Sequence, residues 1–457
     1  MEGTFISALC VVVFIFAILT MRGTVLDITR PKENPWSLFW YAQLLLVLIP
    51  IAVVSNVSIE ELQETNSRVL NGAVPGTETE IAYTVLGTIT LYTMALSLFL
   101  RMLGLRRLRD EIAYISGHYR VLLYYSSGLV ILSFILLAIF NLFGFKHAFL
   151  AALSGTQSLL KTRLHNAYEA GMPSQLIPML FWAGYVLSIL GGMLFRLRYK
   201  MRGFLLLTIA LFIASGPGNK APVIIAILLW LAAARVIVPP KLASMRSFAI
   251  AAAGLFILTF LSYSLYKAQY PQANFLEFPS YLMLRLGVGQ MAGTYVTLGL
   301  AHTGELPQGE YYWALVPGAS FVNPEYINYQ KMLMIVSEGY SYKEIGVKNS
   351  YFISEACAIG GGVLLWLSPI IVAFSTALGI LIFKMIFQVI FFRPISPQLA
   401  IVMYLLTHDI TGGFAAFPLL KGIIVQGLLL AILFFPVKVC TVCVYSGNRS
   451  YTPSPLR

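Results

Sequence analysis

Long apolar runs separated by short polar segments make up most of this chain. Each run is continuous rather than alternating, which is typical of membrane-spanning helices and not of a transmembrane β-barrel. A helix needs roughly 17 or more apolar residues to cross a hydrocarbon core of about 30 Å. The pattern therefore predicts an all-α polytopic membrane protein with about 11 transmembrane helices (10–12). We expect them at about 4–21, 36–55, 81–100, 121–143, 176–195, 203–216, 221–238, 247–266, 355–383, 397–411 and 420–437.

Two polar segments interrupt this pattern, although residues 1–457 are expected to form a single integral membrane domain. Residues 144–175 are the shorter segment. Residues 267–354 are too polar to lie in lipid, are rich in Tyr, Gly, Pro and Asn, and contain six acids and five bases. We expect them to form one large loop with short helices. Its apolar stretch at 281–301 is expected to form a helix packed into, or resting on, the outer face, because a crossing there would put the later bases on the wrong side.

Composition and charge placement give the chain its expected orientation. Hydrophobic residues make up 58% of the chain and charged residues only 11%, against about a quarter in soluble proteins. Twenty of the 31 bases but only four of the 19 acids lie at alternate ends of the spans. Basic loops stay in the cytoplasm, so both polar segments and the N-terminus are expected outside and the C-terminus inside. This asymmetry explains the net charge of +12 without a nucleic-acid partner.

The N-terminal sequence and the cysteines give no sign of a targeting segment or a metal site. No base precedes the first apolar run, so we expect no cleaved signal peptide. Cys440 and Cys443 form a CxxC pair with no second pair nearby, which indicates a structural role or lipidation on the cytoplasmic tail. We expect no metal, no cofactor and no disulfide framework.

Cations are scarce on the predicted outer side, which makes those present there notable. Residues 156–170 are expected to form an amphipathic helix at the interface that carries Arg163, His165 and Tyr168, either as an anchor or as a ligand site. Lys220 follows a Gly-Pro-Gly break. It is either a lysine reaching for the lipid surface or an anion contact at a helix start.

Two further groups are candidates for chemistry. Arg285 lies in an otherwise apolar helix, where its guanidinium needs a phosphate or carboxylate partner. His408 and Asp409 lie where the span predicted at about 397–411 ends and the chain turns toward the final span, and there they can supply a general base, unless Asp409 only caps the turn. Glu355 and His302 are weaker alternatives for the base.

These features together resemble the Wzy-type polymerases that build bacterial O-antigen and enterobacterial common antigen. The resemblance is architectural and covers most of the chain. It rests on the loop with Arg163, Tyr168 and Gly171, on the Gly218-x-Lys220 reversal, and on the long outer loop. That loop begins with the Arg285 helix and continues with LVPGASFVNPEYINYQ, and the run NSYFISEACAIGGG follows before the next span.

The resemblance implies a GT-C-type membrane glycosyltransferase, related to O-antigen ligases, in the bacterial inner membrane with a periplasmic active face. The substrates would be undecaprenyl-diphosphate-linked oligosaccharides, and a chain-length-regulating co-polymerase of the Wzz kind is an expected partner. Arg163, Lys220 and Arg285 would stabilise the diphosphate leaving group. His408 or Asp409 would be the base, with His165 next.

Aromatic side chains are the remaining candidates for substrate binding. Tyr281 and Tyr326 are expected to stack on sugar rings, together with Tyr168 and His165 as substrate contacts. Tyr311, Tyr312 and Trp313 are open to the same interpretation, although such residues are commonly membrane anchors.

Two rival functions remain at this point. An O-antigen ligase-type transferase would use the same donor. A flippase or other transporter for lipid-linked oligosaccharides would need two pseudo-symmetric halves, which the sequence does not display.

Overall fold

The structure is a computed structural model. It describes residues 2–30, 36–65, 70–105, 119–154, 159–168, 176–234, 263, 278, 288–307, 309–316, 323, 329–339, 348–390, 397–418 and 435–441. This part of the chain is all-helical, and within it the β-type pairing is one isolated parallel bridge between Ser350 and Gly412. The fold prediction of an all-α chain is confirmed to that extent.

The chain divides into two compact units. Unit 1 comprises residues 1–107, 239–378 and 408–421, and unit 2 comprises residues 108–238, 379–407 and 422–457.

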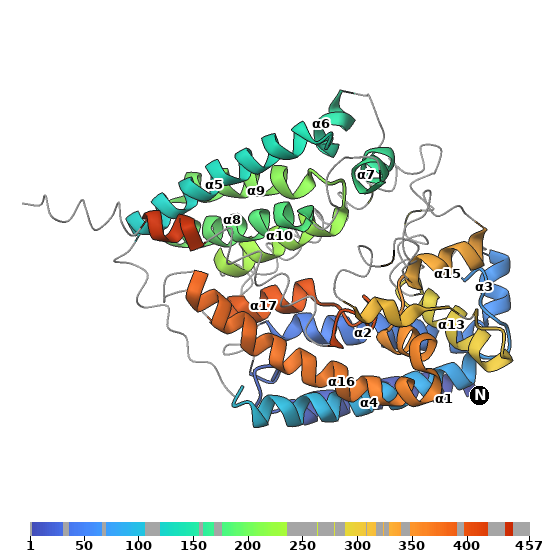
Figure 1. Ribbon diagram of the computed structural model, residues 1–457. Coiled ribbons are helices and arrows are strands. Elements are labelled where there is room, and N and C mark those ends of the chain that lie inside the picture. The colour runs from blue at the N-terminus through green and yellow to red at the C-terminus, as the bar shows by residue number, and fades with distance from the viewer. Residues whose placement is uncertain are drawn as a thin grey trace, which may run out of the picture. The chain divides into compact units, whose positions relative to one another are not determined.

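The first half of the chain supplies helices to both units (Figure 1). They are α1 (Glu2–Thr20), α2 (Ser37–Asn56), α3 (Ile59–Thr65), α4 (Glu78–Met102), α5 (Tyr119–Leu142), α6 (Ala148–Leu153), α7 (Leu159–Tyr168), α8 (Pro178–Arg196), α9 (Lys200–Ser215) and α10 (Lys220–Ala234). The second half contains α13 (Ala292–Thr303), the 3₁₀ helix η4 (Tyr311–Leu315), α15 (Tyr329–Glu338), α16 (Phe352–Ile390) and α17 (Pro397–Thr407).

In unit 1, α1, α2 and α4 pack against one another and provide the apolar frame of the unit (Figure 1). Trp40 and Tyr92 are fully buried there, and the Trp40 indole N–H donates to the Tyr92 hydroxyl at 3.3 Å. Large aromatic side chains with a satisfied polar end suit such an interior. The frame supports α13, which also contacts α4 and α15.

In unit 2, α8 is the central helix and contacts α5, α9 and α10. Its glycines allow this close packing. A Cβ on Gly192 would lie 2.4 Å from the Trp230 carbonyl oxygen, and one on Gly191 would lie 2.9 Å from the Gly203 carbonyl oxygen. Small residues let helix backbones approach where side chains would otherwise separate them.

Six helices of the described chain are long and apolar enough to cross a membrane, judged by length and composition. They are Glu2–Thr20, Ser37–Asn56, Glu78–Met102, Leu122–Leu142, Pro178–Arg196 and Phe352–Ile386. Each coincides with a predicted span. The spans predicted at 203–216, 221–238 and 397–411 correspond to α9, α10 and α17, which have 16, 15 and 11 residues. The span at 247–266 and most of that at 420–437 lie outside the described residues, so the number of 11 stays a prediction.

Two helices differ from their predicted bounds for identifiable reasons. α17 ends at Thr407 rather than at 411, because the following residues pair with the chain that precedes α16. α16 is longer than the predicted span at 355–383 but is interrupted inside it. Gly361 has φ +61° and ψ −155°, a region that essentially only glycine occupies.

The two polar segments contain short helices where they are described. α7 covers residues 159–168 of the helix predicted at 156–170. In the stretch at 281–301, the description begins at residue 288, and α13 follows from Ala292. Every residue from Ala292 to Gly299 is buried, so α13 packs inside unit 1 instead of resting on its surface.

Candidate functional site

The sequence-predicted site residues are divided between the two units. Arg163 and His165 lie on α7 in unit 2, where Arg163 is exposed and the Nε2 atom of His165 is 3.1 Å from the Gly144 carbonyl oxygen. Tyr168 is the last residue of α7, and Lys220 is the first residue of α10. The side chains of these last two residues lie outside the description.

Unit 1 contains the other predicted residues. His408 and Asp409 are described, whereas Arg285, Tyr281 and Tyr326 lie outside the described residues. The predicted grouping of the three cations around one anion therefore stays a prediction. The structure does bring His408 and Asp409 into a cluster of polar side chains within unit 1, and this cluster is the candidate functional site.

The backbone of the cluster consists of two chain segments that lie side by side, residues 349–355 and 408–417. Ser350 and Gly412 form the parallel bridge. The Phe352 N–H donates to the Ile410 carbonyl oxygen at 3.1 Å. These bonds place the start of α16 beside the residues that follow α17 in the sequence.

Glu355 is the central charged group of this cluster. It lies in the first turn of α16, is only 3% exposed, and its Oε2 accepts the Ala415 N–H at 2.8 Å. A carboxylate taken out of water needs such donors, because an ionised group without them is costly to bury. The bond also fixes the 408–417 segment to the first turn of α16.

Gly413 lies close to this carboxylate. A Cβ added there would lie 2.7 Å from Oε2 of Glu355 and 3.1 Å from Nε2 of Gln330. Gly413 also has φ +99°, where side chains are strongly disfavoured. Both the backbone conformation and the available space therefore require glycine beside Glu355.

Hydroxyl groups of α13 form one wall of the cluster. Thr294 Oγ1 accepts the Tyr351 N–H at 2.9 Å and lies 3.0 Å from the Ser354 hydroxyl, which donates to it. The Gly293 N–H donates to the Asn349 carbonyl oxygen at 2.9 Å. These bonds join α13 to the residues that lead into α16, so α13 helps to orient Glu355.

A buried tyrosine of α15 forms the next layer. The Tyr329 side chain is fully buried, and its hydroxyl makes a short hydrogen bond with that of Thr297. Burial raises the pKa of Tyr329 well above its ordinary value, and the nearby charge of Glu355 adds to this, while the bond with Thr297 opposes it. Tyr329 therefore stays a neutral hydroxyl next to the carboxylate.

His408 and Asp409 lie at the other side of the cluster. The His408 side chain is 7% exposed, and its backbone carbonyl accepts the Gln43 Nε2–H of α2 at 3.2 Å. Asp409 Oδ1 accepts the Thr411 N–H at 3.0 Å, which is the geometry of a turn cap. Burial raises the pKa of Asp409, although the hydrogen bonds from Thr411 oppose the rise.

From the sequence, Glu355 ranks below His408 and Asp409 as a candidate base. In the structure, however, Glu355 is the carboxylate that accepts the Ala415 N–H and for which Gly413 leaves space. An acid in the first turn of a helix is ordinary, because it suits the helix dipole. The stronger signal is that this acid begins an apolar run and that a Gly-Gly pair follows Asp409. Gln43, in the middle of an apolar run, gives the same kind of signal. His302, the other alternative base, is exposed and lies 2.8 Å from Glu80.

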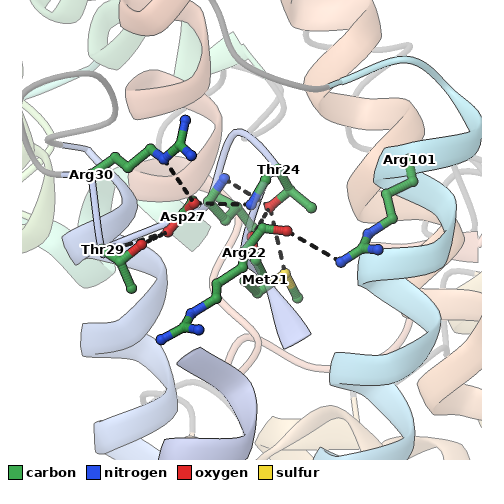
Figure 2. Close-up of polar contacts among 9 residues, drawn as sticks. Met21, Arg22, Thr24, Asp27, Thr29, Arg30 and Arg101 are labelled. Atoms are coloured by element: carbon green, nitrogen blue, oxygen red, sulfur yellow. Dashed lines mark hydrogen bonds and ion pairs between the residues drawn. The ribbon is translucent and has the colours of Figure 1, made fainter. Parts of the chain in front are cut away.

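A separate polar cluster occupies the turn at residues 21–30, which belongs to the base-rich end of the spans. Figure 2 shows Asp27 enclosed by this turn, with Arg101 reaching it from α4. Asp27 accepts the Gly23 N–H at 2.9 Å and both the N–H and hydroxyl of Thr29 at 2.9 and 2.6 Å. Arg101 donates to the Arg22 carbonyl oxygen at 3.2 Å. All of these donors and acceptors belong to the turn or to residues next to it. We therefore interpret this cluster as one that stabilises the fold.

The pKa of Asp27 follows from the same contacts. Burial by itself would raise it, but the donors of Gly23 and Thr29, together with the positive charge of Arg30, outweigh burial and hold the pKa below its ordinary value. Asp27 is thus ionised and fastens the connection between α1 and α2.

Among the described residues, no group of three or more His, Cys, Asp or Glu side chains is placed to hold a metal ion. A comparison with protein-family models, curated proteins and solved structures found no match. Fold and sequence together define a class: an all-helical chain with several helices of membrane-spanning length and composition. They also define a buried polar cluster around one carboxylate in unit 1.

Proposed function

We propose that this chain is an inner-membrane polymerase of bacterial surface polysaccharide. It joins undecaprenyl-diphosphate-linked oligosaccharide repeat units on the periplasmic face, using about 11 transmembrane helices. Residues 144–175 and 267–354 are the periplasmic segments, and the C-terminus is cytoplasmic. The uneven distribution of bases and acids supports this orientation.

The proposed reaction is a glycosyl transfer from a lipid-linked donor to a hydroxyl of the acceptor. A hydroxyl of the acceptor repeat unit attacks the anomeric carbon of the donor's lipid-linked sugar. A new C–O bond forms, the bond from that carbon to the diphosphate oxygen breaks, and a base receives the hydroxyl proton. The leaving lipid diphosphate carries about two negative charges, so fixed cations lower the barrier as this charge develops. Arg163, Lys220 and Arg285 are the proposed cations.

The single observation that carries the proposal is the buried cluster around Glu355. A carboxylate that is 3% exposed lies at the start of a helix otherwise apolar for most of its length. A second carboxylate, that of Asp409, belongs to the 408–417 segment, which is hydrogen-bonded to Glu355 through the Ala415 N–H. Burying such groups between apolar helices is costly, and acid–base chemistry at the membrane surface is a reason to retain them. Asp409, with its raised pKa, is the proposed base, and His408 is the alternative.

A deletion strain of the source bacterium tests the proposal directly, with its surface glycan separated by size. Single repeat units attached to the surface support a polymerase. Loss of all attached glycan indicates a ligase, and lipid-linked units retained in the cytoplasm indicate a flippase. A normal distribution of long chains in the deletion strain would refute a role in glycan assembly.

Variants in the same strain then test the proposed cations. Arg163→Ala, Lys220→Ala and Arg285→Ala should each abolish long chains while the protein level stays unchanged. Arg202→Ala is the matched control, because Arg202 is exposed on α9 at the predicted cytoplasmic end. Normal modal lengths from all three test variants would contradict the cation assignment.

A further inference from the structure

The 3₁₀ helix η4 holds its residues in two different environments. Tyr311 is buried, its hydroxyl donates to the Pro307 carbonyl oxygen at 3.1 Å, and its ring packs edge-on against Tyr329 at 5.4 Å. Gly309 passes so close to this ring that a Cβ would lie 2.7 Å from it. Tyr311 therefore anchors the turn to α15 at a defined position.

The next two side chains, Tyr312 and Trp313, are less buried than Tyr311 and their rings lie side by side. Tyr312 is 50% exposed, and its ring lies 5.8 Å from that of Trp313 with 27° between their planes. The Trp313 indole N–H donates to Oε2 of Glu310 at 2.8 Å. The bond holds the indole in one orientation and sets an exposed carboxylate beside the two rings. We call these three residues, Glu310, Tyr312 and Trp313, the aromatic platform.

We propose that the aromatic platform is a carbohydrate-binding site that holds pyranose rings of the glycan chain. The proposal rests on the function proposed above, since it makes the platform a subsite for the polysaccharide substrate. A pyranose ring presents a flat face of C–H groups to an aromatic face, and its hydroxyls need hydrogen-bond acceptors close by. Two nearly parallel rings, that of Tyr312 half exposed and that of Trp313 partly exposed, provide the flat face, and the adjacent carboxylate provides the acceptor.

The position of the platform in unit 1 fits such a subsite. Tyr311 belongs to the same turn and contacts Tyr329, and the residue after Tyr329 is Gln330, which lies beside Gly413 near Glu355. One layer of buried side chains therefore connects the platform to the candidate functional site. A chain of sugars resting on the platform would lie near the site without occupying it.

A membrane anchor is the competing interpretation of exposed Tyr and Trp. The local charges disfavour it. Glu305 and Glu310 are both exposed in the loop that leads from α13 into η4, and carboxylates repel the phosphate groups of anionic lipids. The Trp313 N–H is also already bonded to Glu310 and is not available to a lipid carbonyl.

The test uses the full chain in lipid nanodiscs, with its six tryptophans replaced by 5-fluorotryptophan. The fluorine resonance of residue 313 is assigned from the signal missing in Trp313→Phe. The probe is the soluble oligosaccharide released by mild acid from the surface polysaccharide of the source bacterium. We expect a saturable shift of the Trp313 resonance, while that of buried Trp230 stays fixed.

Variants separate stacking from indirect effects. Tyr312→Ala should weaken probe binding about fivefold, as expected for the loss of one aromatic contact. Tyr312→Phe should bind normally, because it keeps the ring. Tyr83→Ala is the matched control, since Tyr83 is an exposed tyrosine of α4 with 42% exposure.

Two results would overturn the proposal: no shift of the Trp313 resonance at saturating probe, or broadening of that resonance by a lipid with a nitroxide headgroup, which would identify a membrane anchor. Failure of the polymerase proposal is recognised separately, because the deletion strain would then keep its long chains while the Trp313 shift could still be observed.

Discussion

Replacing Gly413 with alanine should break the contact on which the candidate functional site depends. The new Cβ would lie 2.7 Å from Oε2 of Glu355, closer than side-chain carbons approach oxygen in folded proteins. The carboxylate must move by several tenths of an ångström or more. Its bond to the Ala415 N–H, now 2.8 Å, is then lengthened or lost.

The free energy of unfolding that Gly413→Ala loses has two contributions. Alanine at φ +99° costs about 1–2 kcal/mol, as left-handed conformations do for residues with a Cβ. Loss of a hydrogen bond to a charged group adds about 1.5–3 kcal/mol. The sum is roughly 2.5–5 kcal/mol, which is a large part of the stability of an ordinary domain.

Gly304 provides the matched control. It has φ +75° at the end of α13, and a Cβ there would meet nothing within 4 Å. Gly304→Ala therefore carries the backbone cost of about 1–2 kcal/mol without the collision. Thermal unfolding of the purified chain in detergent should show a clearly larger loss for Gly413→Ala than for Gly304→Ala.

A second substitution tests the mechanism of the loss. Glu355→Asp shortens the side chain by one methylene and moves the carboxylate away from position 413. In the Gly413→Ala background it should recover part of the lost thermal stability, a coupling that independent sites do not show. Equal losses for the two glycine variants, together with no recovery by Glu355→Asp, would refute the assignment of Gly413 as the space reserved for this carboxylate.

The carboxyl groups of Asp409 and Asp27 are expected to change the stability of the fold with pH in opposite directions. Because the pKa of Asp409 is raised in the folded chain, Asp409 stabilises the fold at low pH and this contribution is lost as the pH rises through the raised pKa. Asp409→Asn should therefore be the more stable protein at neutral pH in thermal unfolding, yet form no long glycan chains; wild-type chain lengths would exclude Asp409 as the base. The pKa of Asp27 is lowered, so its stabilisation is present above its ordinary pKa of about 3.9 and is lost as the pH falls through the folded value. Asp27→Asn should unfold at a lower temperature than wild type at pH 7, and this difference should shrink under acidic conditions; a constant difference across the pH range would contradict the bonding around Asp27.

Much of the helical framework was predictable because the hydrophobic effect acts on runs of residues. The spans at 4–21, 36–55 and 81–100 coincide with α1, α2 and α4 within a few residues, since an apolar run of that length has few alternatives in a membrane. The end of α17 was not predictable in the same way. Its last turn depends on a parallel bridge to residue 350, and the pairing partner is distant in the sequence.

The candidate site was predictable only in its local parts. His408 and Asp409 stand out because acid and histidine are rare between apolar runs. The importance of Glu355 could not be ranked from sequence, because it depends on a donor from Ala415 and on the missing Cβ of Gly413. Thr294 is an ordinary helix residue until α13 places it against the start of α16.

The sequence by itself determined the class of this protein: an all-helical chain whose apolar runs match a membrane and whose charges favour one orientation. These properties depend on the composition of the chain and on the order of its residues. They do not depend on which segments pack against one another. Tertiary structure decided which carboxylate is enclosed, which glycine makes room for it, and which tyrosine of η4 is buried and which stays exposed. Such features arise from contacts between residues far apart in sequence, as between Glu355 and Ala415, and they exist only once the helices have packed.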